Sequence, residues 1–210
     1  MLINSDVWIL LYHFGKRGVT DLTKRKKKEC LILIVDFEKV YDSVDWGFLE
    51  YLLSRCGFCE KWRAWMKACV FGGSMSILIN GSPTEEISMQ RGLKQGDPLA
   101  PFLFLLVAEG SSGLMRNAVD QNMFKGFELK RGGVTLSHLQ YADDTLCIGE
   151  ASVENLRTLK VMLRGFEMVS GHKVNFHKSC LIGVNVAPDF MEMACSFLNC
   201  WKGVVPFMYL

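Results

Sequence analysis

Three aspartates occupy positions suited to metal-dependent chemistry. Asp143 and Asp144 are adjacent and lie between two short apolar runs, and Asp36 directly follows the apolar run 31–35. An Asp pair alone is a common turn signal, but a carboxylate at the end of a buried strand is costly unless it binds a positive group. If these strands are neighbours, three carboxylates converge, and a divalent metal is the usual relief for their repulsion.

The ligand types indicate which metal such a site would take. Carboxylates without a nearby His or Cys favour Mg²⁺ or Mn²⁺ over Zn²⁺. Two such ions about 3.5–4 Å apart can activate an attacking oxygen and stabilise a leaving one, as in phosphoryl and nucleotidyl transfer. Cys56 and Cys59 have the spacing of half a zinc site or of a redox pair, but Cys195 and Cys200 do not complete it. Zinc is therefore a weak alternative.

Strands and helices alternate along the chain and must position these residues. The spacing of apolar residues, caps and breakers predicts strands at 31–35, 138–141, 145–148, 173–176 and 181–184, a hairpin at Asn80-Gly81, and short strands beside Gly132-Gly133. It predicts helices from Asp45 to Gly57, around 62–70, over 99–118, over 153–169 and from Pro188. This mixture predicts an α+β fold, one sheet with helices on one face.

Several apolar stripes are predicted to be core. The helix around 62–70 presents Trp62, Trp65, Met66, Cys69 and Val70 on one face. The helix over 99–118 is apolar nearly all round in its first half, which predicts burial on every side. A return strand is expected near 86–89.

Length and composition limit the class of protein. The chain has 210 residues, of which 50% are apolar and 22% charged, as expected for one domain or a tight pair of subdomains rather than a disordered chain. The apolar stretch 102–108 is too short to cross a bilayer, so no membrane association is expected. The run 7–12 lacks the features of a secretion signal. Eight cysteines then indicate an intracellular, reducing compartment with free thiols.

Positive charge is concentrated near the N-terminus. The net charge is +2, but residues 1–30 hold seven basic and three acidic side chains. The basic run consists of Lys24, Arg25, Lys26, Lys27 and Lys28. It could contact nucleic-acid phosphate or act as a nuclear import signal, and a solvated charged turn is an equal alternative, so nucleus and cytoplasm both stay open. We divide the chain into a basic lead-in, 1–30, and a main domain, 31–210.

Three longer motifs resemble those of one family. The sequences DFEKVYDSVDW (36–46), GLKQGDPLAPF (92–102) and YADD (141–144) resemble motifs A, B and C of reverse transcriptases. Their residues are most similar to the motifs of plant LINE-type (non-LTR) retrotransposons. The resemblance covers about residues 20–210. It implies an RNA-directed DNA polymerase with a palm-like antiparallel sheet, partial fingers and a truncated thumb. It also implies two Mg²⁺ or Mn²⁺ ions, an RNA template, a DNA primer and dNTPs; the oligomeric state stays open.

The resemblance assigns roles to the aspartates and to residues around motifs A and B. Asp36 and Asp143 would bind both catalytic metals, with Asp144 supporting the site. Tyr41 would be the steric gate that excludes a 2′-OH, although a core aromatic is the alternative. Further substrate-binding positions are Gln95 and Gly96 in the nucleotide and template pocket, and the backbone amides around Phe37, Lys39 and Val40 at the triphosphate.

The C-terminal third carries two further implied features. Lys178 matches the motif D lysine, a general acid for pyrophosphate, with Lys173 as its rival and a solvated lysine as a third reading. Residues 206–210 resemble the start of a primer-grip region.

Departures from the family pattern leave a second hypothesis. The first 20 residues do not resemble a fingers segment, and no thumb or endonuclease motif is recognised. Residues 31–210 hold 17 basic and 19 acidic side chains. This net charge is less positive than expected for a groove that binds nucleic acid. The leading hypothesis is an RNA-directed DNA polymerase palm with a two-metal mechanism. The alternative is a non-catalytic, retrotransposon-derived remnant that binds nucleic acid weakly. A group II intron maturase is a third possibility, which the residues of motifs A and B disfavour.

Overall fold

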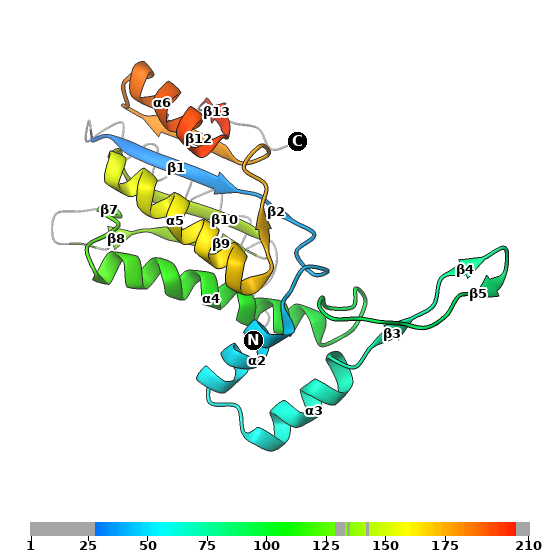
Figure 1. Ribbon diagram of the computed structural model, residues 1–210. Coiled ribbons are helices and arrows are strands. Elements are labelled where there is room, and N and C mark those ends of the chain that lie inside the picture. Colours follow the sequence, from blue (N-terminus) through cyan, green and yellow to red (C-terminus); the bar gives the residue numbers. More distant parts are fainter. Residues whose placement is uncertain (1–27, 129–132, 134, 142, 205–210) are drawn as a thin grey trace. The chain divides into compact units, whose positions relative to one another are not determined.

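The computed structural model describes residues 28–128, 133, 135–141 and 143–204 (Figure 1). The chain divides into two compact units. Of the described residues, the first unit contains those within 28–37, 112–164 and 174–204, and the second contains residues 38–111 and 165–173. Within the described ranges, no helix is long and apolar enough to cross a membrane.

A five-stranded sheet is the centre of the first unit. Its strand order is β13-β12-β1-β10-β9. The bounds are Trp201–Gly203, Cys180–Val184, Cys30–Val35, Asp144–Glu150 and His138–Tyr141, in the same order. The central strand, β1, pairs antiparallel with β10 on one side and with β12 on the other. The strand predicted at 31–35 is therefore confirmed.

Both faces of this sheet are covered, which explains why β1 is apolar at every position. Leu31, Leu33 and Val35 belong to the larger core, to which three helices contribute. These helices are α4 (Ala100–Asp120), α5 (Val153–Ser170) and α6 (Pro188–Leu198) (Figure 1). Cys30 and Ile32 point to the opposite face and belong to a second core made of strand residues. Strand alternation separates the two sets.

One edge of the sheet differs from the prediction. The sheet was expected to be antiparallel, but β13 runs parallel to β12, with Cys180 opposite Trp201. Parallel neighbours need a crossover connection, and α6 supplies it. Pro188 stands in the first turn of α6, as predicted, and Asn199 ends the helix with a φ of 62°. The helix between the two strands thus decides their direction.

Two shorter ladders accompany the five-stranded sheet. β7 (Phe127–Glu128) and β8 (Thr135–Leu136) pair antiparallel and confirm the strands predicted beside Gly132-Gly133, although Gly132 itself lies outside the described residues. β2 (Phe37–Glu38) and β11 (Lys173–Val174) form another two-stranded pair.

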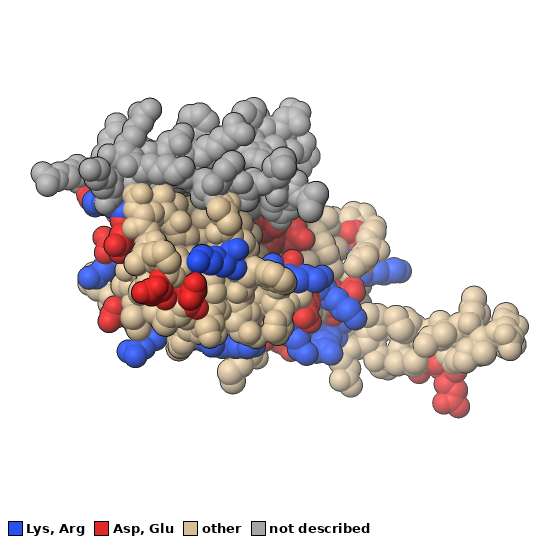
Figure 2. All heavy atoms as spheres, turned by 90° about the horizontal axis from the view of Figure 1, so that it is seen from above, with Lys and Arg blue, Asp and Glu red and all other residues tan. Residues whose placement is uncertain are grey.

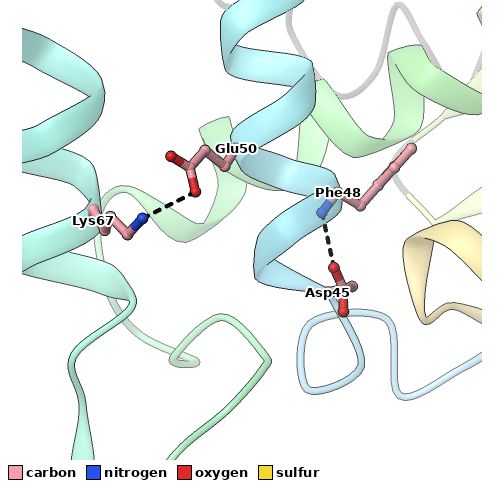
Figure 3. A network of polar contacts seen from close by, with 4 residues as sticks. All are labelled: Asp45, Phe48, Glu50 and Lys67. Carbon is pink, nitrogen blue, oxygen red and sulfur yellow. Dashed lines mark hydrogen bonds and ion pairs between the residues drawn. The ribbon is translucent and has the colours of Figure 1, made fainter. Parts of the chain in front are cut away.

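Two helices of the second unit follow motif A. Asp45 caps α2 (Trp46–Arg55) by accepting a hydrogen bond from the Phe48 amide at 2.8 Å (Figure 3). Gly57, at a φ of 82°, follows its end as predicted. Lys67 of α3 (Glu60–Val70) donates to Glu50 of α2 at 3.3 Å across their exposed surfaces (Figure 3).

The aromatic stripe of α3 is only partly core. Met66 is buried and Trp62 stacks on Phe58, but Trp65 is 55% exposed and Cys69 is also exposed. The prediction that this stripe is core is therefore confirmed only for part of it. The main neighbour of α3 is α2, and one neighbouring helix covers only part of an apolar stripe this wide.

The predicted hairpin is present but shorter than expected. β4 (Leu78–Ile79) turns at Asn80-Gly81 and returns as β5 (Ser82–Pro83). Both turn residues have positive φ, 51° and 83°, as a two-residue hairpin turn requires. The return strand expected near 86–89 is β6 (Ile87–Ser88), which instead pairs with β3 (Ser74–Met75).

The helix after motif B is not buried on every side. Leu103, Phe104 and Val107 are buried, whereas Phe102 and Leu105 are exposed. The all-round burial predicted for its first half is wrong because the neighbours of α4 cover one side of it.

Candidate active site

The pairing of β1 and β10 brings two of the three aspartates to the same end of the sheet. Val35 and Thr145 form the last pair of this ladder. Asp36 follows Val35 and Asp144 precedes Thr145, so each stands one position beyond the pair. Strand alternation assigns both carboxylates to the face of the smaller core, away from the helices. The sheet thus makes neighbours of two residues 108 positions apart.

Asp143 lies in the turn that joins the two strands of motif C. β9 ends at Tyr141, which pairs with Asp144 at the start of β10. Asp143 is an exposed turn residue, and Asp144 is half-buried. Ala142 lies outside the described residues. The turn places Asp143 directly beside Asp144 at the end of the sheet that also carries Asp36.

The donor set fits a hard divalent cation. Asp36, Asp143 and Asp144 offer carboxylate oxygens, the ligands that Mg²⁺ prefers. In the described part of the chain, no three His, Cys, Asp or Glu side chains form a ready group of metal ligands. Mg²⁺ is commonly held by one or two carboxylates together with substrate phosphates rather than by an all-protein cage. The three aspartates match such an open site in the type of their oxygen donors.

The backbone of Asp36 is held by the turn that contains Lys178. The Asp36 amide donates to the hydroxyl of Ser179 at 3.1 Å, and the Asp36 carbonyl accepts from the Asn175 amide at 2.8 Å. Lys178 lies between these two residues and is exposed. Lys173, the other candidate for the motif D lysine, is an exposed residue of β11. These contacts involve Asn175 and Ser179 rather than either lysine, so the role of Lys178 stays a prediction.

In the second unit, motif B contacts the motif A turn. The Leu93 amide donates to the Tyr41 carbonyl at 2.7 Å, and the Gly92 amide donates to the Val44 carbonyl at 2.8 Å. Gly92 has a φ of 93°, and a Cβ there would lie 2.7 Å from the Asp42 carbonyl oxygen. Only glycine permits this approach. The two motifs therefore form one local structure.

Three predicted substrate-binding residues share one cavity. Tyr41, Gln95 and Gly96 line a cavity of about 620 Å³ together with residues at the start of α4. Tyr41 is half-buried beside Phe104, with ring centroids 5.1 Å apart. Gln95 donates a long hydrogen bond to Asp42 at 3.4 Å. The size of the cavity is in the range of small-molecule pockets.

The other residues predicted at the substrate are spread over both units. Phe37 packs against the larger core of the first unit. Lys39 and Val40 belong to the second unit, where Lys39 has a φ of 46° and its carbonyl accepts from the Ser43 amide at 3.0 Å. This turn gives the segment a fixed shape, while its predicted contact with a triphosphate stays a prediction.

Of the predicted basic run, residues 24–27 lie outside the described residues, as does the predicted primer-grip segment 206–210. Lys28 is exposed and forms an ion pair with Glu128 at 3.5 Å. Figure 2 shows acidic and basic side chains side by side on the described part of one face. The binding of nucleic acid by residues 24–28 stays a prediction.

Two buried polar residues beside the predicted site residues were not anticipated from the sequence. Ser179 is 1% exposed and supports Asp36, and His172 is 2% exposed and packs between Phe104 and Phe166. Burial lowers the pKa of His172 to about 4, despite an opposing hydrogen bond with the Val40 backbone. Polar residues and glycine flank both positions, as in Gly171-His172-Lys173 and Lys178-Ser179, so no signal of their burial was present in the sequence.

The cysteines contribute little reactivity near the site. All eight are free thiols, and Cys56 and Cys59 are exposed. Burial raises the pKa of Cys147 to about 12, which keeps that thiol protonated at neutral pH.

Comparison with known families agrees with this geometry. The profile described as "Reverse transcriptase (RNA-dependent DNA polymerase)" matches residues 7–197. The chain belongs to this family. The family as a class uses divalent metal ions, in keeping with the carboxylate donors at the end of the sheet.

Relatives from mobile elements and from a plant extend the comparison. The chain is 27% identical over 172 residues to the Pol polyprotein of the type-2 retrotransposable element R2DM of Drosophila melanogaster, covering 82% of this chain and 15% of that protein. It is 28% identical over 168 residues to a type-1 R2 polyprotein of Popillia japonica, covering 77% and 22%. An uncharacterized mitochondrial protein of Arabidopsis thaliana is 44% identical over 69 residues, covering 33% and 57%. The similarity to non-LTR retrotransposon reverse transcriptases is confirmed.

Solved structures show the same fold in telomerases. The structure of Candida albicans telomerase in complex with a fragment of telomeric RNA matches with a TM-score of 0.58 and 13% identity, covering 85% of this chain and 30% of that one. Apo telomerase from Candida tropicalis matches with a TM-score of 0.52 and 14% identity, covering 84% and 36%. The predicted α+β class is confirmed.

Proposed function

We propose that this chain is the palm part of an RNA-directed DNA polymerase, which adds dNTPs to a DNA primer on an RNA template. The observation that carries the proposal is the placement of Asp36 and Asp144 at one end of neighbouring strands, with Asp143 in the adjoining turn. Family membership supports the same reaction, and the telomerase relative of this fold was solved with RNA bound. The curated polyproteins are several times longer than this chain.

In this proposal the aspartates hold two Mg²⁺ or Mn²⁺ ions. Asp36 and Asp143 would hold both ions through carboxylate oxygens, and Asp144 would support the site from the first position of β10. Bound there, the ions supply activation of the primer 3′-OH and charge stabilisation at the phosphates. Asp36 is fixed for this task through its backbone, by Asn175 and Ser179.

The second unit supplies the nucleotide pocket of this proposal. Tyr41 excludes the 2′-OH of a ribonucleotide, and Gln95 and Gly96 line the base and template side of the same cavity. The primer 3′-OH attacks the α-phosphate, forming the new phosphodiester bond as the bond to pyrophosphate breaks. Lys178 donates a proton to the departing pyrophosphate.

The test is primer extension on an RNA template with Mg²⁺ or Mn²⁺. We expect incorporation by the purified chain and its loss in the variant Asp143→Asn/Asp144→Asn. Asp120→Asn is the matched control, because Asp120 is an exposed carboxylate at the end of α4. Incorporation that survives in the double variant contradicts the proposed aspartate roles. A folded chain without any incorporation supports the alternative, a non-catalytic remnant that binds nucleic acid weakly.

A further inference from the structure

The end of α5 contacts the motif A turn through three consecutive residues. The Ser170 carbonyl accepts a hydrogen bond from the Asp45 amide at 2.8 Å. Gly171 approaches so closely that a Cβ would overlap the Ser43 carbonyl oxygen. All of these residues belong to the second unit. The turn that carries Tyr41 therefore depends on the 170–172 segment.

His172 is the third residue of this segment and reaches the turn with its side chain. Its ring is hydrogen-bonded to the backbone of Val40, the residue before Tyr41. The bond favours the protonated ring, so the imidazole N–H is the donor and the Val40 carbonyl the acceptor. Because burial keeps the ring neutral at physiological pH, it acts as a fixed donor without adding charge to the pocket.

A second route joins the same two residues through aromatic rings. The His172 and Phe104 centroids are 6.0 Å apart, and those of Phe104 and Tyr41 are 5.1 Å apart. Phe166 meets the His172 ring edge-on at 5.9 Å and 74°. Phe104 is thus in ring contact with both Tyr41 and His172, in the range where aromatic pairs attract.

We propose that His172 is a positioning residue that fixes the Tyr41 ring and so determines how strongly the pocket discriminates against ribonucleotides. The inference rests on the proposed function, because the gate role of Tyr41 is part of it. A steric gate rejects a 2′-OH only if its ring cannot move aside. The bond to Val40 fixes the backbone of the gate, and the contact through Phe104 limits the movement of its ring.

Two variants separate these routes. His172→Phe keeps an aromatic ring in contact with Phe104 and Phe166 but removes the donor to Val40. His172→Gln keeps a donor but removes the ring. In His172→Phe, we expect the ratio of kcat/KM for a ribonucleotide to kcat/KM for the matching deoxynucleotide to rise about fivefold. A factor of this size corresponds to the loss of one neutral hydrogen bond. The change should fall mainly on the ribonucleotide KM. His172→Gln should restore part of the discrimination.

A double variant tests whether His172 acts through Tyr41. Tyr41→Ala should weaken discrimination strongly, and adding His172→Phe should then change the ratio no further, because the positioned ring is gone. If His172 only stabilises the fold, both nucleotides lose incorporation equally and the ratio stays constant. That result, or additive effects in the double variant, overturns the inference.

A measurement without catalysis distinguishes this inference from the proposed function. If the wild-type chain folds but incorporates no nucleotide, the proposed function fails, and the positioning is tested by NMR of the chain with ¹³C-labelled tyrosine rings. His172→Phe should shift the Tyr41 ring signals, assigned with Tyr41→Phe, and leave those of exposed Tyr51 on α2 unchanged. Unchanged Tyr41 signals show that His172 does not position the ring.

Discussion

The amide of Asp36 donates a hydrogen bond to the hydroxyl of Ser179, 143 residues further along the chain, at 3.1 Å. The same hydroxyl donates to the Asn175 carbonyl at 2.9 Å. Asp36 therefore takes its position both from β1, which it follows, and from the turn between β11 and β12. The strand β1 fixes the backbone that precedes Asp36, and the hydrogen bond with Ser179 fixes the backbone amide of Asp36 itself.

Ser179→Ala should lower the free energy of unfolding by about 1–3 kcal/mol, because the partly buried Asp36 amide and Asn175 carbonyl both lose their hydroxyl partner. Urea denaturation measures this change. Ser196→Ala, at an exposed position on α6, is the control and should change stability by less than about 0.5 kcal/mol. Equal effects in the two variants would show that the Ser179 hydroxyl does not support Asp36.

Gly92→Ala should destabilise the protein more than Gly57→Ala. Both glycines have positive φ, 93° and 82°, but a Cβ at Gly92 meets the Asp42 carbonyl oxygen at 2.7 Å whereas one at Gly57 meets nothing within 4 Å. Gly57→Ala should cost about 1 kcal/mol for its backbone conformation alone, and Gly92→Ala about 1–3 kcal/mol more. Thermal and urea denaturation measure the difference. A cost that is the same at both positions contradicts a close contact between motifs A and B.

Millimolar Mg²⁺ should raise the melting temperature, because a ligand that binds only the folded state stabilises it. At ten times the Kd the gain is about 1.4 kcal/mol, or about 3–5 °C for a chain of this size. Differential scanning fluorimetry at constant ionic strength measures it. The shift should disappear in Asp143→Asn and persist in Asp120→Asn. A shift of equal size in both variants would place the bound Mg²⁺ elsewhere.

The stability of the protein should fall in acid partly because of His172. Burial lowers the pKa of this imidazole from 6.5 to about 4 in the folded chain. Unfolding therefore takes up a proton between these values, so the contribution is complete above pH 6.5 and is lost as the pH falls to about 4. It amounts to about 3 kcal/mol. Urea denaturation across this window should show a steeper decline for the wild type than for His172→Phe. If the unfolding free energies of the wild type and of His172→Phe fall equally with pH, the His172 ring is not buried in its neutral form.

Features set by neighbouring residues were predictable from the sequence. The caps at Asp45 and Gly57 and the turn at Asn80-Gly81 are present as expected. Each depends on a few adjacent residues, so its cause is readable in the chain. The apolar run of β1 likewise showed a strand covered on both faces. The motifs also predicted that the three aspartates belong together, although not which strands bring Asp36 and Asp144 to the same end of the sheet.

Tertiary structure alone decided the features that join distant segments. The parallel direction of β13 follows from the α6 crossover, and the exposure of Trp65 follows from how little of α3 its neighbours cover. The hydrogen bond from Asp36 to Ser179, and the contact of His172 with the backbone of Val40, join residues more than a hundred positions apart. The sequence by itself determined the family and predicted the chemistry of the carboxylates, because both depend on residue type and local order. Packing determined which side chains support that chemistry, because their partners are neighbours only in the folded chain.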